Sequence, residues 1–292
     1  MQHSDCIVIQ GSNMAECHPV GFQWVMEAKA RGATVIHVDP RYTRTSALAD
    51  LYVPLRAGSD IAFIGGIINH VLTEEKDFRE YVLHYTNAAT LVSEDFRDCE
   101  DLDGVFSGLD EAKHHYDPHS WQYEGVQVQQ PTGEVDEQYE DRVHAAGGAE
   151  THGSGGPRAS AGAPRDPTLR HPRCVYQVLK RHFARYTPDM VEAVCGVPRE
   201  TFRAVCDALT ANSGRERTSS FVYAVGWTQH TTGSQYIRAA SILQLLLGNI
   251  GRPGGGIQAL RGHASIQGSS DIPTLFNLLP GYLPMPHAHQ HL

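Results

Sequence analysis

Residues 6–13 read Cys-Ile-Val-Ile-Gln-Gly-Ser-Asn, and this stretch decides the fold class. The apolar, β-branched run over 6–10 predicts a short buried strand, which stops at Gly11. Helix-forming residues with apolar spacing follow over 20–30, and a second β-branched run follows over 34–38. A buried strand, a helix and another buried strand in succession are typical of a parallel sheet with helices on its faces.

The same alternation continues along the chain. We expect a third strand over 50–55, a helix over 61–72 capped by Ser59 and Asp60, helices over 174–185, 188–195, 198–212 and 234–247, and a fourth buried strand over 221–225. The glycine-rich stretch 251–256 predicts turn or loop. The sequence therefore predicts an α/β protein with a parallel sheet that carries helices on its faces.

The balance of charge disfavours some partners. Among 292 residues, 33 acids stand against 24 lysines and arginines, which gives a formal net charge of -9 at pH 7. Because proteins that bind nucleic acid or anionic membranes favour a basic surface, we expect neither partner. No apolar run approaches the roughly 20 residues that span a bilayer, and no signal peptide is visible. Since a strand follows Met1 almost at once, we expect an internal piece of a longer protein.

The six cysteines include no Cys-x-x-Cys pair, so the sequence predicts neither a zinc ribbon nor an iron–sulfur cluster. Several stand in apolar stretches, as Cys6 does, and we expect buried free thiols. Cys17 and His18 are neighbours at an expected helix start, where such pairs seldom bind a metal. A solvated tail is the simpler interpretation of the last three histidines, His287, His289 and His291.

The composition changes sharply between residues 124 and 170. The stretches 145–148 and 152–164 are rich in Gly, Ser, Ala and Pro and hold few large apolar residues. Such a segment buries too little apolar surface to offset the entropy lost in ordering it. We therefore expect residues 124–170 to form a flexible inserted loop that proteases cut first.

Polar, glycine-containing turns follow the predicted strands. In an open parallel sheet, ligands bind beyond the carboxyl ends of the strands, where a glycine lets backbone N–H groups approach a phosphate. Asp39, after the second strand, can accept hydrogen bonds from ribose hydroxyls or a base edge. These turns predict a nucleotide-bearing ligand, and they are Gly11-Ser12-Asn13, Asp39-Pro40-Arg41, Gly58-Ser59-Asp60 and Gly226-Trp227-Thr228-Gln229.

Two alternatives stay open for these turns. Gly11 can mark a simple tight turn, and Asp39 can cap a helix ahead of Pro40. The Gly-x-Asn of residues 11–13 differs from the Gly-x-Gly-x-x-Gly of nicotinamide-dependent proteins, so an ordinary NAD site is disfavoured.

Several motifs, in order, resemble the molybdopterin oxidoreductase family. Residues 11–19 match its Gly-x-Asn-x-x-Glu-x-His-Pro signature. The matches continue in the family's order and spacing through Val38-Asp39-Pro40-Arg41, Thr45, Ala49-Asp50, Gly58-Ser59-Asp60-Ile61-Ala62, 223–230, 247–251, Arg261-Gly262-His263, Gln267-Gly268 and Asp271. Segments 85–88, 116–121 and 171–175 resemble in particular the large catalytic subunit of respiratory-type formate dehydrogenases. The resemblance covers nearly the whole chain except the insert.

The resemblance implies a cofactor, molybdopterin guanine dinucleotide carrying molybdenum or tungsten. The implied fold is a Rossmann-like, doubly wound parallel sheet that is truncated at both ends. Residues 1–258 would form the Rossmann-like domain that binds the cofactor, and residues 259–292 would begin a second, incomplete domain that reaches the active site. The residues expected to meet the cofactor are Gly11, Asn13, Glu16, His18, Asp39, Pro40, Arg41, Gly58, Asp60, Gly226, Thr228, Gln229 and Gly262.

The resemblance also implies a reaction, the oxidation of formate to carbon dioxide at the metal, with electrons leaving through a 4Fe-4S cluster. Arg261 would act as a catalytic residue that holds the formate carboxylate, and His263 would tune the same site. The implied partners are formate, an iron–sulfur electron-transfer subunit and a membrane cytochrome subunit. The implied location is the periplasmic face of the membrane, although nothing in the chain itself fixes a location.

Departures from the family pattern limit what the chain can do. The cluster cysteines and the selenocysteine or cysteine ligand of the metal lie upstream in the family and are absent here, so we expect the chain alone to be inactive and assign it no metal ligand. One alternative is another molybdopterin oxidoreductase, such as a nitrate or sulfur-compound reductase. Another is a cofactor-free scaffold domain of the same fold, which the presence of Asp39, Asp60 and Arg261 disfavours.

Overall fold

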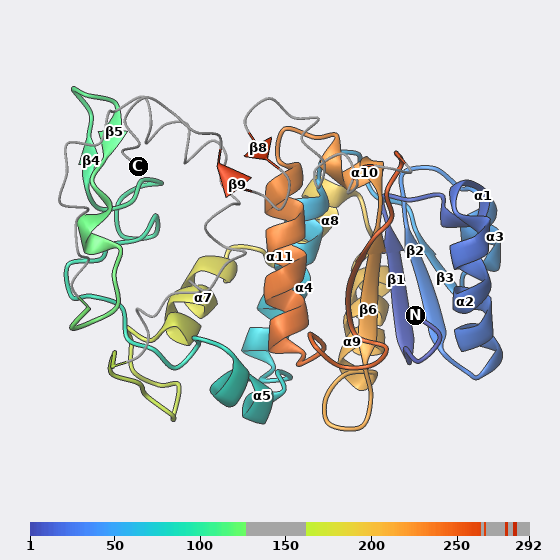
Figure 1. Cartoon of the computed structure of the whole chain (residues 1–292), viewed down its shortest axis with the longest axis horizontal. Helices are drawn as coiled ribbons and strands as arrows, with labels where there is room; N and C mark the ends of the chain where they lie inside the picture. The colour runs from blue at the N-terminus through green and yellow to red at the C-terminus, as the bar shows by residue number, and fades with distance from the viewer. Residues whose placement is uncertain (127–161, 264–265, 267–277, 280–282, 285–292) are drawn as a thin grey trace. The chain divides into compact units, whose positions relative to one another are not determined.

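The computed structural model contains a five-stranded parallel sheet and describes residues 1–126, 162–263, 266, 278–279 and 283–284 (Figure 1). The strand order is β3-β2-β1-β6-β7. The strands are β1 (Cys6–Gln10), β2 (Thr34–Val38), β3 (Leu51–Val53), β6 (Ser219–Tyr223) and β7 (Gly256–Ala259). Because β1 lies between β2 and β6, the chain reverses the direction of winding beside β1, and such a reversal is where open α/β sheets bind ligands.

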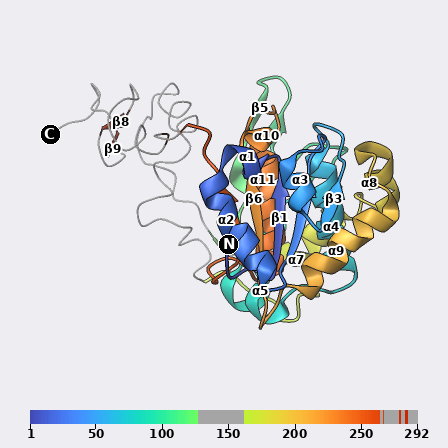
Figure 2. The same ribbon diagram turned by 90° about the vertical axis from the view of Figure 1, so that its right-hand side faces the viewer.

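Helices cover both faces of this sheet (Figures 1 and 2). On one face, Ile7 and Ile9 of β1 pack with Phe22 and Val25 of α2 (Pro19–Ala30). On the other face, a larger core joins Val8, Ile36 and Phe221 to side chains of α4 (Asp60–Thr73) and α11 (Gly233–Leu246). The remaining helices of this unit are α1 (Met14–Cys17), α3 (Arg44–Leu48), α5 (Arg79–Tyr85), α7 (Val175–Phe183), α8 (Pro188–Cys195), α9 (Arg199–Ala211) and α10 (Val225–Thr228).

The predicted α/β class and the doubly wound parallel sheet are confirmed. β1 and β2 have the predicted bounds, because both are uninterrupted runs of residues that suit a strand buried on both faces. Helix α8 also begins and ends as predicted. The Thr187 hydroxyl accepts a hydrogen bond from the Met190 N–H at its start, and Gly196 adopts the left-handed conformation at its end.

Three local predictions are wrong. The fourth strand begins at Ser219 and ends at Tyr223, since Val225 already belongs to α10. The predicted loop over 251–256 ends one residue early, at Gly255, because Gly256 begins β7, which pairs with β6 from Ser220 onward. Ser59 precedes α4 without capping it, and its hydroxyl donates to the Arg56 carbonyl at 2.6 Å.

The chain divides into two units. The first unit holds residues 1–91, 97–106 and 165–262, and with them the whole parallel sheet. The second unit holds residues 92–96, 107–164 and 263–292. Its described parts include antiparallel β4 (Leu109–Asp110) and β5 (His115–Tyr116), the short helix η1 (Pro118–Ser120), and antiparallel β8 (Leu278–Leu279) and β9 (Leu283–Pro284).

Of the predicted flexible insert, residues 127–161 lie outside the described residues. Its last residues belong to the first unit and are held by tertiary contacts. Leu169 is buried, Arg165 pairs with Thr90 across an antiparallel bridge, and the Asp166 carboxylate accepts backbone hydrogen bonds from Arg170 and His171. These hydrogen bonds, with another from Thr168, hold the pKa of Asp166 well below its ordinary value.

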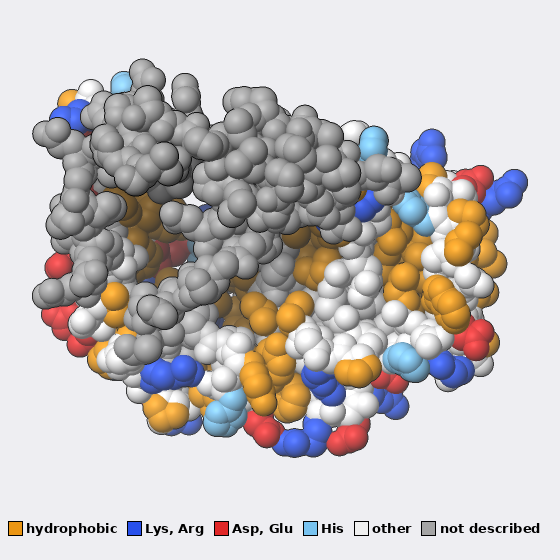
Figure 3. Space-filling view, in the orientation of Figure 1, with side chains coloured by type: hydrophobic (Ala, Val, Ile, Leu, Met, Phe, Trp, Pro, Cys, Tyr) orange, Lys and Arg blue, Asp and Glu red, His pale blue; other side chains and the backbone are white. Residues whose placement is uncertain are grey.

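The surface and the cysteines complete the description. Within the described part of the chain, no helix combines the length and the apolar character that crossing a membrane requires. On the face that Figure 3 shows, acidic and basic side chains alternate along the lower edge, so this face presents mixed charge.

Four cysteines are buried free thiols, as predicted, and burial raises the pKa of Cys6 to about 12. Cys17 is exposed and Cys99 is half-buried.

Candidate functional site

A cavity of about 540 Å³ lies at the carboxyl ends of β1, β2, β3 and β6, entirely within the first unit. We call it the turn cavity, because its walls are the turns that follow these strands. It is lined by Gly11, Ser12, Asn13, Cys17, His18, Val38, Asp39, Pro40, Arg41, Thr43, Leu55, Ala57, Asp60, Ala224, Val225, Gly226, His230 and Gly262. Four turns that are far apart in sequence therefore meet at one place.

Two glycines let the turns after β1 and β6 touch. Gly11 has φ +68°, a conformation that side chains other than glycine rarely adopt, and its carbonyl accepts a hydrogen bond from the Gly226 N–H at 3.1 Å. A Cβ atom on Gly226 would lie only 2.5 Å from that carbonyl oxygen. The predicted importance of both glycines thus has a steric cause: the two backbones are in direct contact.

Asp60 is buried at the start of α4, and its carboxylate connects three elements. Its Oδ1 accepts hydrogen bonds from Gln10 Nε2 at 2.7 Å and from Trp227 Nε1 at 3.1 Å. Burial raises the pKa of Asp60, and these two hydrogen bonds oppose that shift. The side chain therefore joins the ends of β1, α4 and α10, and its environment favours the protonated form more than water does.

His37 was not singled out from the sequence, yet it organises the turns after β1 and β2. Its Nε2 donates to the Ser12 carbonyl at 3.1 Å, so its Nδ1 is unprotonated and accepts from the Ser46 hydroxyl at 2.8 Å. The Ser46 hydroxyl in turn accepts from the Thr43 N–H. Burial lowers the pKa of His37, although Asp39 and the Ser12 carbonyl act in the opposite direction. A neutral, fully buried imidazole holds these turns.

The motif residues after β1 form a network of their own. The Asn13 amide donates to the Glu16 carboxylate, and its oxygen accepts from the Thr45 hydroxyl at 2.9 Å. Glu16 also pairs with Arg44, with 3.4 Å between Arg44 Nε and Glu16 Oε1. Glu16 is not among the residues lining the cavity. It contacts Asn13 and Arg44 beside it, so the motif ties α1 to α3 at one wall.

The turn after β2 presents Asp39, Pro40 and Arg41 to the cavity. Asp39 Oδ1 accepts from the Arg41 N–H at 2.8 Å, and the Asp39 side chain is 15% exposed. The Tyr52 hydroxyl donates to the Asp39 carbonyl at 3.0 Å. Asp39 thus shapes its own turn and lines the cavity as well, but it caps no helix, because the next helix, α3, begins at Arg44 after the N-cap residue Thr43.

His18 connects the cavity to the end of the first unit. Its Nε2 donates to the Arg261 carbonyl at 3.2 Å, and its Nδ1 is buried with no hydrogen-bond partner among the described residues. Gly262 lines the cavity, whereas Arg261 is exposed and is not among the lining residues. His263 is exposed and belongs to the second unit.

Several buried polar atoms around the cavity lack partners. Ser12 Oγ, His18 Nδ1 and His230 Nδ1 belong to lining residues, and none of the three has a hydrogen-bond partner among the residues that the structure describes. Gln10 Oε1, beside Asp60, is unpaired as well. Leaving a buried polar group without a partner costs about 1–3 kcal/mol. Their concentration at one cavity indicates a site suited to a polar ligand.

The predicted site residues separate into two groups. Those that line the cavity are Gly11, Asn13, His18, Asp39, Pro40, Arg41, Asp60, Gly226 and Gly262, and those outside its lining are Glu16, Gly58, Thr228, Gln229, Arg261 and His263. Sequence reasoning missed His230, which also lines the cavity, and His37 behind it. The signal for His37 was present, since a histidine in an otherwise apolar, fully buried strand needs nearby hydrogen-bond partners.

Known proteins resemble the chain over nearly its whole length. A family model described as molybdopterin oxidoreductase matches residues 1–286. The nitrate-inducible formate dehydrogenase major subunit of Escherichia coli (strain K12) is 45% identical over 291 residues, which is 99% of this chain and 25% of that protein. The formate dehydrogenase subunit alpha of Megalodesulfovibrio gigas is 46% identical over 283 residues, which is 97% of this chain and 24% of that protein.

One solved structure is similar as well. Acetylene hydratase from Pelobacter acetylenicus has a TM-score of 0.48 and 19% sequence identity, covering 84% of this chain and 22% of that chain. The present chain spans about a quarter of the length of the curated relatives that it matches.

Proposed function

Because the chain belongs to the molybdopterin oxidoreductase family, we propose that the turn cavity holds the guanosine end of a molybdopterin guanine dinucleotide. One observation carries this proposal: four strand-end turns with motif residues surround one cavity that contains unpaired buried polar atoms. The cavity volume falls within the range of roughly 300–1,000 Å³ that is usual for ligand sites. Residues 1–258 would be the cofactor-binding domain, and residues 259–292 would belong to a second domain.

The polar side chains of the cavity suit different parts of such a ligand. The Asp39 carboxylate can accept hydrogen bonds from the base edge or the ribose, while Arg41 brings a positive charge to the same turn. Ser12 Oγ can donate to a phosphate oxygen. His18 Nδ1 has no hydrogen-bond partner among the described residues, and a ribose hydroxyl, which can both donate and accept, suits it.

Gly11, Gly226 and Asp60 suit the phosphate-bearing part. The glycines add no side chain to the cavity wall, which lets a ligand approach the backbone closely. The raised pKa of Asp60 means that this carboxyl takes up a proton more readily than in water. Proton uptake would remove a negative charge beside the phosphates. Gly58, Pro40 and the motif residues Asn13 and Glu16 would hold the surrounding turns in place.

For the whole protein we propose the activity named in its relatives, formate dehydrogenase. The bound molybdenum or tungsten would supply the two-electron oxidation of formate, and electrons would leave through a 4Fe-4S cluster to an electron-transfer subunit. Thr228, Gln229 and Gly262 would border the path from the cavity to the metal. Arg261 would pair with the formate carboxylate, because a planar guanidinium can bond both oxygens, and His263 would tune the same site. A membrane cytochrome partner and a periplasmic location complete the proposal.

The test uses the full-length subunit with Asp39→Asn and Asp39→Ala. Both variants are expected to lose bound guanine nucleotide, measured as GMP released by acid, because a buried donor of the ligand loses its charged acceptor, at a cost of about 1–3 kcal/mol. Asn can still accept the hydrogen bond from the Arg41 N–H, so only the Ala variant should also melt at a lower temperature. Glu27→Ala, on the exposed face of α2, serves as the control.

One pair of results would contradict the proposed role of Asp39 in nucleotide binding. If Asp39→Asn retained a full complement of nucleotide while Asp39→Ala only melted early, Asp39 would hold its turn and take no part in binding. The chain of 292 residues by itself is expected to reduce no acceptor dye with formate and to retain no molybdenum, since catalysis at a metal needs its complete ligand set. Formate-dependent dye reduction by the purified chain would disprove that expectation.

A further inference from the structure

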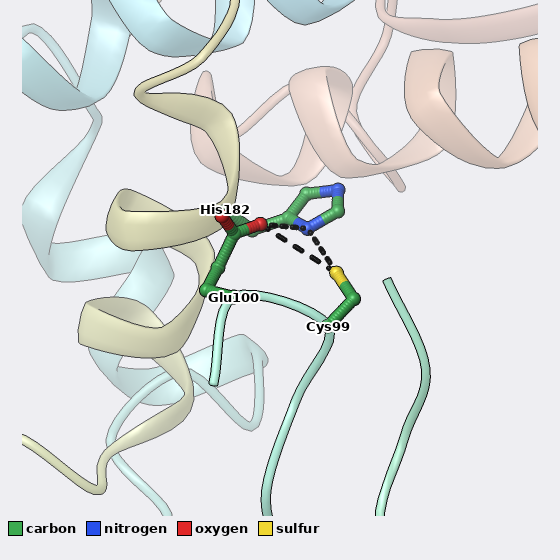
Figure 4. Close-up of side chains that lie close together, drawn as sticks. All are labelled: Cys99, Glu100 and His182. Carbon is green, nitrogen blue, oxygen red and sulfur yellow. Dashed lines mark hydrogen bonds and ion pairs between the residues drawn. The ribbon is translucent and has the colours of Figure 1, made fainter. Parts of the chain in front are cut away.

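Cys99, Glu100 and His182 lie close together in the first unit, away from the turn cavity (Figure 4). Cys99 and Glu100 belong to the loop of residues 97–106, and His182 belongs to α7. Cys99 Sγ lies 3.5 Å from His182 Nδ1 and 3.5 Å from Glu100 Oε1, and His182 Nδ1 lies 3.3 Å from Glu100 Oε1. One sulfur, one nitrogen and one oxygen therefore form a nearly equilateral triangle.

The sides of this triangle match those of a tetrahedral zinc site. With ordinary bond lengths of about 2.3 Å to sulfur, 2.05 Å to nitrogen and 2.1 Å to oxygen, ligands at tetrahedral angles are separated by about 3.6, 3.6 and 3.4 Å. The three measured separations are each within a tenth of an ångström of these values. We propose that Cys99, Glu100 and His182 bind a zinc ion, with water as its fourth ligand.

Neighbouring residues hold the three ligands in position. The buried Asp98 accepts from Arg181 Nη2 at 2.9 Å, which fastens the loop to α7 beside His182. Asp98 Oδ1 also accepts from the Glu100 N–H at 3.0 Å. The loop needs little rearrangement to accept an ion.

Arg185 is the competitor of the ion. Its Nη2 pairs with Glu100 Oε1 and lies 3.6 Å from Cys99 Sγ, so it neutralises the same groups that a zinc ion would bind. The Arg185 side chain is 42% exposed, which leaves it room to turn outward. A thiolate, a carboxylate and a neutral imidazole together carry two negative charges, which a divalent ion balances and a single guanidinium does not.

The test titrates the full chain with Co²⁺, whose bond to a thiolate produces an ultraviolet charge-transfer band that bonds to histidine or carboxylate do not. All proteins carry His287→Ala, His289→Ala and His291→Ala, because these histidines offer a second place for metal. We expect a band that saturates at one Co²⁺ per chain and disappears when Zn²⁺ is added. Cys99→Ser should abolish the band, and the exposed Cys17→Ser, a matched control, should leave it unchanged.

Two further variants test the remaining ligands and the competitor. His182→Ala should weaken Co²⁺ binding about tenfold or more, whereas the exposed His84→Ala should not. Arg185→Ala should bind Co²⁺ more tightly than the parent. Zn²⁺ should raise the melting temperature of the parent but not that of Cys99→Ser, whose metal-free melting temperature serves as the folding control.

The results that would overturn the proposal are equally definite. No charge-transfer band at stoichiometric Co²⁺ would show that the triangle is a hydrogen-bonded cluster closed by Arg185. A band that persists in Cys99→Ser would place the ion at another cysteine. Equal or weaker binding in Arg185→Ala would show that the arginine does not compete for the three ligands.

Discussion

Gly226→Ala should destabilise the protein because it forces apart two backbones that are in contact. The new Cβ would lie 2.5 Å from the Gly11 carbonyl oxygen and 2.8 Å from both the carbonyl carbon and Cα of Gly11. Since all three are backbone atoms, no side chain can turn away, and the two turns must separate by close to an ångström. Overpacking of this kind costs about 1–3 kcal/mol.

The same movement stretches a hydrogen bond. The Gly226 N–H donates to the Gly11 carbonyl at 3.1 Å, and its loss adds about 1 kcal/mol. The expected decrease in the free energy of unfolding is therefore about 2–4 kcal/mol. Because domains are stable by only about 5–15 kcal/mol, the variant should unfold at a clearly lower urea concentration, with an unchanged slope m.

Substitutions at two other glycines distinguish steric contact from backbone strain as the cause of a loss of stability. Gly21 lies in α2, and a Cβ there would meet only the flexible end of Met14 at 3.2 Å, so Gly21→Ala should be neutral or gain up to about 1 kcal/mol of helix propensity. Gly58 has φ +86° with nothing near the added Cβ, so Gly58→Ala should cost about 1–2 kcal/mol from backbone strain alone. A Gly226→Ala protein as stable as the parent, or more stable than Gly58→Ala, would refute the steric argument.

Three further outcomes are expected. Asp60→Asn keeps the acceptor for Gln10 and Trp227 but removes the buried charge. Because the pKa of Asp60 in the folded protein is raised above 3.8, its contribution to stability is greatest below that pH and declines as pH rises through the raised pKa. Urea unfolding of the variant should therefore show a flatter dependence of stability on pH and a higher free energy of unfolding at pH 7. Asn249→Ala leaves the buried Ser219 N–H without its acceptor and should lower the free energy of unfolding by about 1–3 kcal/mol. A decrease below about half a kcal/mol, roughly the limit of such measurements, would contradict this expectation. Arg261→Lys in the full-length enzyme should lower kcat and raise the KM for formate at unchanged molybdenum content, and normal formate kinetics would remove Arg261 from the catalytic residues.

The sequence predicted those parts of the fold that local patterns determine. β1 and β2 are short runs of mostly apolar, β-branched residues, and α8 carries both a capping threonine and a terminal glycine, so their bounds follow from nearby residues. The start of β6 does not follow from them. The buried Ser219 depends on Asn249, distant in sequence, which supplies both an acceptor for its N–H and a donor to its hydroxyl. β7 was missed because its four residues become a strand only by pairing with β6.

The residues of the candidate site also fall into those that local motifs predicted and those that only distant contacts bring together. Motif spacing pointed to Gly11, Asp39, Asp60 and Gly226, which lie together because strand ends meet at one edge of the sheet. The hydrogen bond from Trp227 to Asp60 joins residues 167 positions apart and has no local signature. The zinc ligands lie 83 positions apart at their widest, so no spacing rule for metal motifs could bring them together.

The place of β1 between β2 and β6 also sets an order of events in folding. β1 and β2 are close in sequence and can pair early, whereas the hydroxyls of Ser4 and Ser220, which meet beside the β1–β6 pairing, are 216 positions apart. Contacts of such long range form slowly, because a large loop must close before they stabilise anything. During synthesis, the turn after β6 leaves the ribosome long after the turn after β1. The turn cavity therefore cannot form until β6 has been made, so insertion of the proposed cofactor would follow folding of this unit rather than guide its first steps.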